Sequence, residues 1–408
     1  MTNNKLGALG LLFFMFSLLL SVNVKADDSK EIDTIFESVY GPFNDDVSYE
    51  CRDLLNSIKK SKRDLKIKSQ RLLSSSLSRQ LIIENDAFSD LIKKGEDRHY
   101  TNGLRLSWIN NPCSNDNDYF TEKIISLLGG SSAISRVYSG NSISMQMYTP
   151  FNIDIPTREV NDRPYVGWLS YGFGSSKINF LSEYDGIEKK LKIQDVHRLE
   201  LQLGVTGPES AQGDMQQWWH TITNDNEPRG WAKQVPKKLG AQLLYMYRYN
   251  SFITKSIRST FHLGAMMGNI QNFVTTGVLF SIGNYHDAYP ETTMEPAIID
   301  GNAEPKNEYR ALPSYPFNSD EDELYFILGF DYRYIYSSIF IEGSGDAKHN
   351  IELEPSVTDL IAGVTWKPSK YDFKGTLKLI DRSKEFISPD KSLEKEHLIG
   401  QLIFEFYY

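Results

Sequence analysis

The feature that most constrains the fold is a strict alternation of apolar and polar side chains in short segments from about residue 78 onward. In the last segment, Leu398, Leu402 and Phe404 lie on one face, and Gln401 and Glu405 lie on the other. Successive side chains of a strand point to opposite sides of a sheet, so this period predicts strands with one apolar and one polar face. A dry protein core accepts charge only at high cost, whereas the lumen of a membrane barrel can hydrate it.

The alternation recurs in about a dozen segments of roughly 9 to 12 residues, the span of a tilted strand across a bilayer. Tyr and Phe are frequent near the strand ends, as in an interfacial aromatic girdle. The sequence therefore predicts an all-β fold, a transmembrane antiparallel β-barrel of about 12 strands within residues 78–408. The segments are 101–108, 142–148, 165–173, 199–206, 239–249, 257–267, 271–282, 324–334, 337–345, 357–366, 371–380 and 398–408, and a further strand is expected to end at 84–86.

Composition excludes several other classes of protein. The chain carries 44 Lys and Arg against 53 Asp and Glu, a formal net charge of −9, which argues against a nucleic-acid-binding protein. With 2 Cys it forms neither a disulfide-rich scaffold nor a four-cysteine zinc site. A single long apolar run argues against a bundle of membrane helices.

That apolar run, residues 6–22, belongs to an expected signal peptide over residues 1–26. Lys5 precedes the run, and Ala26 offers the small residue that a signal peptidase recognises. Export exposes Cys51 and Cys113 to an oxidising compartment, where they are able to pair.

Residues 27–77 differ from the barrel segments and are expected to form a helix-prone basic N-terminal arm. Lys59, Lys60, Lys62 and Arg63 lie close together there, with apolar residues spaced between basic ones. The arm is either a solvated helical segment or a surface for anionic lipid.

One segment between predicted strands does not alternate. Residues 209–222 follow the break at Gly207-Pro208 and fit a short helix on an inter-strand loop. Gln216 and His220 are four residues apart, so they share a face of that helix. Residues 284–322, rich in Asn, Pro, Glu and Asp, suit a long surface loop.

The chain has 7 His and shows no G-x-S-x-G, H-E-x-x-H or P-loop motif. By itself, His220 beside two Trp residues is more often a loop or aromatic-belt residue than a base. Oxygen-bearing side chains at 84–86 and 97–102 suit a hard cation such as Ca²⁺, but the same residue types fill ordinary turns.

Four blocks in order resemble the lipid A 3′-O-deacylase family of outer-membrane barrels, over about a third of the chain. Each block alone is weak, whereas their order and spacing together are specific. They are Glu84-Asn85-Asp86-Ala87-Phe88, then Asp97-Arg98-His99-Tyr100-Thr101-Asn102-Gly103-Leu104, then Tyr148-Thr149-Pro150 with Asp162-Arg163-Pro164-Tyr165-Val166-Gly167-Trp168, then Gly204-Val205-Thr206-Gly207-Pro208 leading to His220, Gly230-Trp231 and Gln234.

The resemblance implies a Ca²⁺-dependent esterase that removes the 3′-linked acyloxyacyl chain from lipid A of lipopolysaccharide, in the outer leaflet of the outer membrane. His220 is expected to act as general base on water, with Gln216 and Thr101 orienting the water or the imidazole. Asp86 and Asn85 are the expected metal ligands, and Asn85 is also a donor to the ester carbonyl.

Other positions carried over from the family are less well defined. A basic residue expected between Tyr148-Thr149-Pro150 and Asp162-Arg163 corresponds to Arg158, and an acidic residue after His220 corresponds to Asp225 or Glu227. The chain is expected to be a monomer. Three alternatives stay open: an outer-membrane phospholipase, a small non-enzymatic porin, and an inactive barrel that only binds lipopolysaccharide.

Overall fold

The computed structural model describes residues 76–86, 99–110, 120–128, 135–157, 160–185, 190–224, 226–254, 256–284, 322–344, 349–369, 371, 373–394 and 396–407. The expected signal peptide, the basic arm and both cysteines lie outside these residues. So do Arg158, Asp225 and most of the predicted loop at 284–322.

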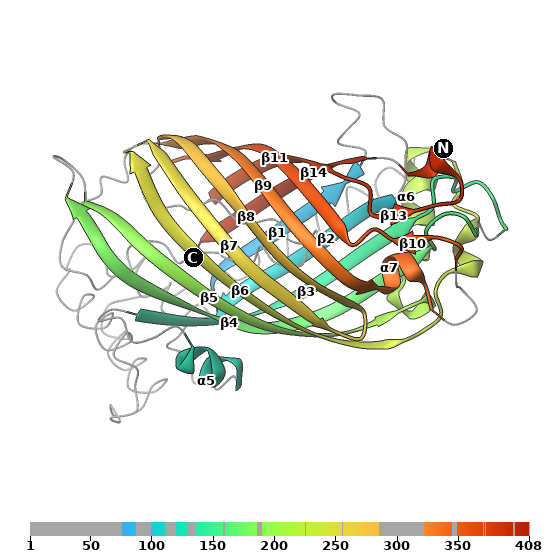
Figure 1. The fold of residues 1–408 in the computed structure, drawn as a ribbon, viewed down its shortest axis with the longest axis horizontal. Helices are drawn as coiled ribbons and strands as arrows, with labels where there is room; N and C mark the ends of the chain where they lie inside the picture. The colour runs from blue at the N-terminus through green and yellow to red at the C-terminus, as the bar shows by residue number, and fades with distance from the viewer. Residues whose placement is uncertain are drawn as a thin grey trace, which may run out of the picture.

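Twelve antiparallel strands close into a barrel (Figure 1), as the alternation predicts. Neighbouring strands in the sequence pair with each other, and β1 closes the barrel against β14. The strands are β1 (Ser76–Asn85), β2 (His99–Asn110), β3 (Ser135–Thr149), β4 (Val166–Asp185), β5 (Lys190–Thr206), β6 (Leu239–Thr254), β7 (Ile257–Gly268), β8 (Gln271–Asn284), β9 (Glu323–Ser338), β11 (Ser356–Lys367), β12 (Phe373–Arg382) and β14 (His397–Tyr407), and β10 (Glu352–Leu353) pairs with β13 (Phe386–Ile387) outside the barrel.

The two faces of the strands divide as predicted. In β14, Ile399, Gln401 and Glu405 are buried on the lumen side, while Leu402 and Phe404 on the other face are only half-buried. Because the side-chain period of a strand is two, every strand then presents one set of residues to the lumen and the other to the surroundings.

Ion pairs fill much of the barrel interior. Arg105 of β2 donates to both carboxylate oxygens of Glu200 on β5, at 3.0 and 2.9 Å, and Arg198 lies 2.5 Å from the same carboxylate. Nearer the start of β1, Lys374 lies 2.9 Å from Glu405. These charges are buried but paired, which is the condition under which a protein interior tolerates them.

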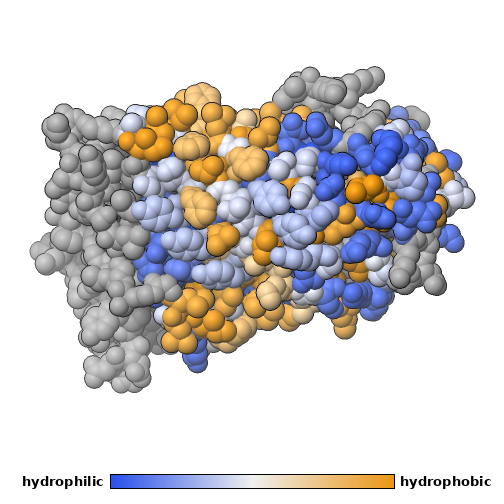
Figure 2. Space-filling view, in the orientation of Figure 1, coloured by the Kyte–Doolittle hydropathy of each residue, from blue (hydrophilic) through white to orange (hydrophobic). Residues whose placement is uncertain are grey.

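The outer face of the barrel carries large apolar side chains that protein does not cover. Figure 2 shows apolar and weakly polar residues along the middle of the molecule and mostly hydrophilic ones around the end that holds α6 (Gln212–Thr223). None of the helices among the described residues is both long enough and apolar enough to span a bilayer. Exposed apolar residues of the strands include Leu203, Phe261, Leu263, Phe326, Leu328, Phe330 and Leu360.

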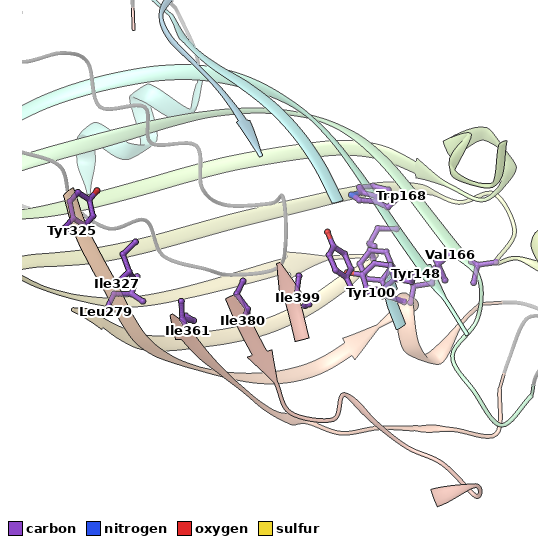
Figure 3. Packing of buried hydrophobic residues seen from close by; sticks show 14 residues of the cluster. Tyr100, Tyr148, Val166, Trp168, Leu279, Tyr325, Ile327, Ile361, Ile380 and Ile399 are labelled. Atoms are coloured by element: carbon purple, nitrogen blue, oxygen red, sulfur yellow. The ribbon is translucent and has the colours of Figure 1, made fainter. Parts of the chain in front are cut away.

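Aromatic residues fill the lumen toward the α6 end. Tyr100 and Tyr148 meet edge to face at 5.1 Å, and Figure 3 shows them beside Ile399. The indole ring of Trp168 packs against two glycines. A Cβ would lie 2.6 Å from this ring at Gly204 and 2.4 Å from it at Gly240. Gly204 of the fourth motif and Gly240 of β6 therefore make room for a bulky ring inside the barrel.

One predicted strand is wrong. Segment 337–345 contains the end of β9 and a single turn of helix, α7 (Ile339–Glu342). Ile339, Phe340 and Ile341 are all buried, so consecutive apolar residues pack here without alternating. The Glu342 carboxylate accepts the backbone N–H of Ser338 at 2.9 Å, and Gly343 ends the turn at φ 66°. The strand expected to end at 84–86 is confirmed as β1, and the barrel has twelve strands without segment 337–345.

Two longer helices lie on connections between strands. The predicted helix at 209–222 is confirmed as a 3-10 turn, η2 (Pro208–Ser210), followed by α6. Asn224 adopts φ 61° at the end of α6, a conformation that Asn tolerates better than most residues. The second helix, α5 (Phe120–Leu127), was not predicted.

Candidate active site

The motif residues gather at the end of the barrel where β1, β3 and β5 finish and β2, β4 and β6 begin. There α6 packs against β3 and β4 (Figure 1). The close approach depends on Gly167 of β4, because a Cβ there would lie 2.1 Å from Ser210 Oγ and 2.7 Å from Gln212 Cγ. Gly167, in the Gly167-Trp168 pair of the third motif, thus allows η2 and the start of α6 to pack closely on the barrel.

The buried face of α6 is polar. Gln212, Gln216 and His220 follow one another at intervals of four residues and are 1, 3 and 7% exposed. The opposite face carries Trp218 and Trp219, which are 37 and 44% exposed. The prediction that Gln216 and His220 share a face is therefore confirmed, and that face is turned toward the barrel.

The imidazole of His220 is held by the backbone. Its Nδ1 lies 2.5 Å from the carbonyl oxygen of Asn226. A carbonyl only accepts, so Nδ1–H is the donor, and in the neutral ring the lone pair is on Nε2. Asn226 is itself held in place, because its Nδ2 donates a hydrogen bond to the Asp154 carboxylate at 3.1 Å.

Gln216 is oriented by a residue to which the sequence assigned no role. Trp231 lies in the 3-10 turn η3 (Gly230–Lys233), and its indole N–H donates to Gln216 Oε1 at 2.6 Å. The ring of Trp231 packs on Tyr165 at 5.0 Å, and a Cβ at Gly213 of α6 would come within 3.0 Å of it. With its oxygen engaged, Gln216 offers N–H groups elsewhere in the site.

A β-bulge shapes the start of β2. Tyr100 pairs with Tyr148 and Asn102 pairs with Met147, so Thr101 is an extra residue relative to β3. Its hydroxyl lies 2.7 Å from that of Thr149. Bulges redirect single side chains and are frequent beside active sites.

The register of β1 brings the other predicted residues to the same place. Asn85 pairs with Asn102, which places Asp86, the next residue of the chain, level with Thr101. Asp86 is 3% exposed. Asn85, Asp86 and Thr101 therefore lie together at the rim of the barrel, beside the strands that carry α6.

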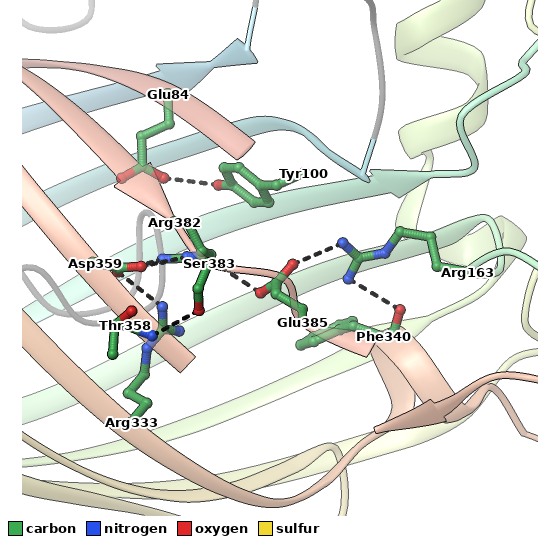
Figure 4. A network of polar contacts seen from close by, with 10 residues as sticks. All are labelled: Glu84, Tyr100, Arg163, Arg333, Phe340, Thr358, Asp359, Arg382, Ser383 and Glu385. Carbon is green, nitrogen blue, oxygen red and sulfur yellow. Dashed lines mark hydrogen bonds and ion pairs between the residues drawn. The ribbon is translucent and has the colours of Figure 1, made fainter. Parts of the chain in front are cut away.

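Glu84 anchors this rim from the lumen side. Its carboxylate accepts the Tyr100 hydroxyl at 2.8 Å (Figure 4) and also the side-chain amide of Gln401. The arrangement needs Gly103, because a Cβ there would lie 1.8 Å from the Tyr100 hydroxyl. The conformation of the bulged residues is thus supported by a buried hydrogen-bonded carboxylate.

The side chain of Arg163 joins three of the loops between strands at this end, its own loop and those of Glu385 and Phe340 (Figure 4). Its guanidinium donates to Glu385 at 2.9 Å and to the carbonyl of Phe340 at 3.3 Å, and lies 4.6 Å above the ring of Tyr148. Tyr148 also stacks on Phe340 at 4.5 Å. Because Thr149 follows Tyr148, this cluster supports the strand end that contacts Thr101.

The partner of Arg163 is strongly acidic. Burial alone would raise the pKa of Glu385, but the guanidinium groups of Arg163 and Arg382 lower that pKa to about 2. Arg382 in turn binds Asp359, which also accepts from Arg333 at 2.9 Å. These ion pairs were not predicted, since the sequence separates Arg163 from Glu385 by 222 positions.

The side chain of Glu227 lies away from His220. Its carboxylate accepts from Gln217 at 3.3 Å and lies 3.5 Å from Arg229, on the exposed side of α6. In the part of the chain that the structure describes, no group of three or more His, Cys, Asp or Glu could hold a metal ion. The calcium site therefore stays a prediction.

A closed antiparallel barrel with an uncovered apolar belt and hydrophilic connections is the architecture of an outer-membrane β-barrel protein. A family model described as outer membrane protein LpxR matches residues 65–408, and the chain belongs to this family. The protein thus resides in the outer membrane. The prediction of family, fold and location is confirmed.

Comparison with solved structures supports the fold in one case. LpxR from Salmonella typhimurium is similar in fold, with a TM-score of 0.58 at 14% identity, over 81% of this chain and 100% of that chain. The β domain of the Bordetella autotransporter BrkA gives a TM-score of 0.36 at 8% identity, over 82% of this chain and 100% of that one. No curated protein sequence matches this chain.

Proposed function

We propose that this protein is a Ca²⁺-dependent esterase that hydrolyses the 3′-linked acyloxyacyl chain from lipid A, with His220 as the general base. Membership of the LpxR family supports the reaction class. The observation that carries the proposal is the environment of His220, a buried imidazole fixed by a backbone carbonyl at Nδ1 on the polar face of α6.

The hydrogen bond at Nδ1 prepares His220 for proton transfer. It selects the tautomer in which Nε2 accepts a proton from water, and the Asn226 carbonyl then stabilises the imidazolium that forms. The water oxygen attacks the ester carbonyl, and the intermediate expels the 3′ oxygen of the sugar. The same Nε2–H returns the proton to that oxygen, which leaves a free acid and a hydroxyl.

Gln216 and Thr101 position the reacting groups. Since Trp231 engages Gln216 Oε1, Gln216 acts as an N–H donor, suited to the carbonyl oxygen as it becomes negative. The paired hydroxyls of Thr101 and Thr149 orient the attacking water, because a hydroxyl both donates and accepts.

The donor set at the rim fits a calcium ion. The side chains of Asn85, Asp86, Thr101 and Thr149 each carry a hard oxygen atom, which Ca²⁺ prefers, and water and substrate would complete its six to eight ligands. Asp86 and Asn85 would hold the ion, and the bound ion would supply positive charge to the ester oxygen.

The barrel interior does not favour the porin alternative. Opposite charges pair inside the lumen, and Trp168 and the tyrosines occupy its α6 end. The substrate therefore approaches from the surrounding lipid, where the acyl chains of lipid A already lie.

Mass spectrometry of lipid A from cells that express the chain tests this function. The expected result is loss of one 3′-linked acyloxyacyl mass, abolished by chelation of Ca²⁺ and by His220→Ala. Unchanged lipid A from correctly folded, heat-modifiable protein would contradict the proposal. Release of fatty acid from radiolabelled phospholipid, with lipid A left intact, would instead identify a phospholipase.

A further inference from the structure

Helix α5 lies outside the barrel, beside β4, at the end of the barrel opposite α6 (Figure 1). One face of α5 packs on the barrel wall. Ile125 is fully buried there, and the Thr121 hydroxyl lies 2.8 Å from that of Ser175 on β4.

Two further contacts hold α5 in place. Lys177 of β4 donates to the carbonyls of Ser126 and Leu128, at 3.2 and 3.0 Å, and so binds backbone oxygens at the end of the helix. At the other end, Phe120 meets Phe173 of β4 edge to face at 5.6 Å. The helix is thus attached to the wall at its start, middle and end.

The face of α5 that points away from the wall is apolar. Phe120, Ile124 and Leu127 are 45, 42 and 86% exposed, and their spacing places them on one side of the helix. Lys123 and Ser126 are exposed on another side. A helix with one face packed on protein, one exposed apolar face and one exposed polar face is typical of a membrane interface.

The apolar face of α5 continues the membrane-facing surface of the barrel. Phe173, which Phe120 contacts, shares the outer face of β4 with Tyr171, which is 45% exposed and 6.5 Å from Trp108. Figure 2 shows apolar side chains gathered over α5 and on the strands beside it. The exposed face therefore meets the same surroundings as the barrel wall.

We propose that α5 is an interfacial membrane helix, whose face of Phe120, Ile124 and Leu127 inserts among phospholipid acyl chains at the end of the barrel opposite α6. The wall contacts set the depth of the helix, and Lys123 and Ser126 remain at the level of the headgroups. The helix thereby adds to the apolar surface that anchors the barrel in that leaflet.

Spin labelling in phosphatidylcholine liposomes tests the proposal without any measurement of activity. Nitroxides are placed by Ile124→Cys, Leu127→Cys and Ser126→Cys in a chain with Cys51→Ser and Cys113→Ser. Labels at 124 and 127 are expected to relax more with oxygen than with a water-soluble nickel chelate, as a label at Leu263 of β7 does. The label at 126 is expected to show the reverse.

Two outcomes would overturn the proposal. Preferential relaxation by nickel at 124 and 127 would show that the face meets water, and protection from both reagents would show that protein covers it. If the cysteine-free chain fails to fold, Leu127→Trp in the natural background replaces it. Brominated phospholipid should quench the added fluorescence at 127, but not that of Ser126→Trp, and equal quenching would contradict the proposal.

Discussion

Helices α5 and α6 both pack against β3 and β4, at opposite ends of the barrel, and bury opposite kinds of side chain. The buried face of α6 presents two amides and an imidazole, whereas α5 buries an isoleucine and one hydroxyl. On the outside, α5 exposes three apolar residues in a row along one face, while α6 exposes polar residues and a tryptophan pair.

The difference matches the two roles proposed for these helices. A buried polar group costs free energy unless it is hydrogen-bonded, and Trp231 and the Asn226 carbonyl meet that condition for Gln216 and His220. An exposed apolar face marks a contact with a membrane or with another protein. The predictions below test these two interpretations, from the largest expected effect to the smallest.

Replacing His220 by Ala should lower the rate of lipid A deacylation by about 10² to 10⁴-fold, the usual contribution of a general base. The matched control is Gln217→Ala, on the exposed face of the same helix, which should retain activity. Mass spectrometry measures the rate. Equal rates in the two variants would remove the functional distinction between the faces of α6.

Replacing Arg163 by Leu should lower the free energy of unfolding by up to about 3 to 5 kcal/mol, because Glu385 would remain buried with only the longer contact to Arg382, at 3.4 Å. Arg229→Leu is the control, since its ion pair with Glu227 is exposed and such pairs contribute about 0 to 1 kcal/mol. The midpoint of the heat-modifiable band shift in detergent measures both. Similar midpoints would mean that the cluster does not hold the site end together.

Replacing Trp231 by Phe keeps an aromatic ring at this position but removes the indole N–H that orients Gln216. The expected loss is about 10-fold in kcat, corresponding to about 1.4 kcal/mol for one lost hydrogen bond. Trp219→Phe on the exposed face should have no effect. In combination with Gln216→Leu, Trp231→Phe should cause little further loss, and full additivity would contradict a shared role.

Acid should weaken the ion-pair cluster of Arg163 and Glu385. The pKa of Glu385 falls from 4.5 to about 2 in the folded protein. The stability that this carboxylate contributes is therefore complete above about pH 4.5 and is lost as the pH falls toward 2. Unfolding midpoints of the wild type and of Glu385→Gln should show a pH-dependent difference within that window, and parallel curves would contradict it.

The smallest effect is expected from α5. Ile124→Ser with Leu127→Ser should leave deacylation of detergent-dispersed lipid A within about 2-fold of wild type, because α5 lies far from His220. The same variant should fold less efficiently into liposomes, since less apolar surface meets lipid. A large loss of activity in detergent would show that the two helices are coupled.

The barrel was predictable from sequence because its signal is local, a period of two repeated in segments of bilayer length. Gln216 and His220 were placed on one face by the same local reasoning. Segment 337–345 was misassigned, since a run of apolar residues does not distinguish a strand from one turn of helix. Trp231 as the partner of Gln216, and the Arg163–Glu385 pair, depend on how distant loops meet, which no periodicity encodes.

The salt-bridged interior has a consequence for the cell. A bacterium relies on its outer membrane to exclude bile salts and antibiotics, and every open barrel adds a leak. Because Arg105 is paired with Glu200 and Lys374 with Glu405 inside this one, a solute that crosses the lumen has to pass these buried ion pairs, and we expect additional copies of the protein to add little to the permeability of the membrane.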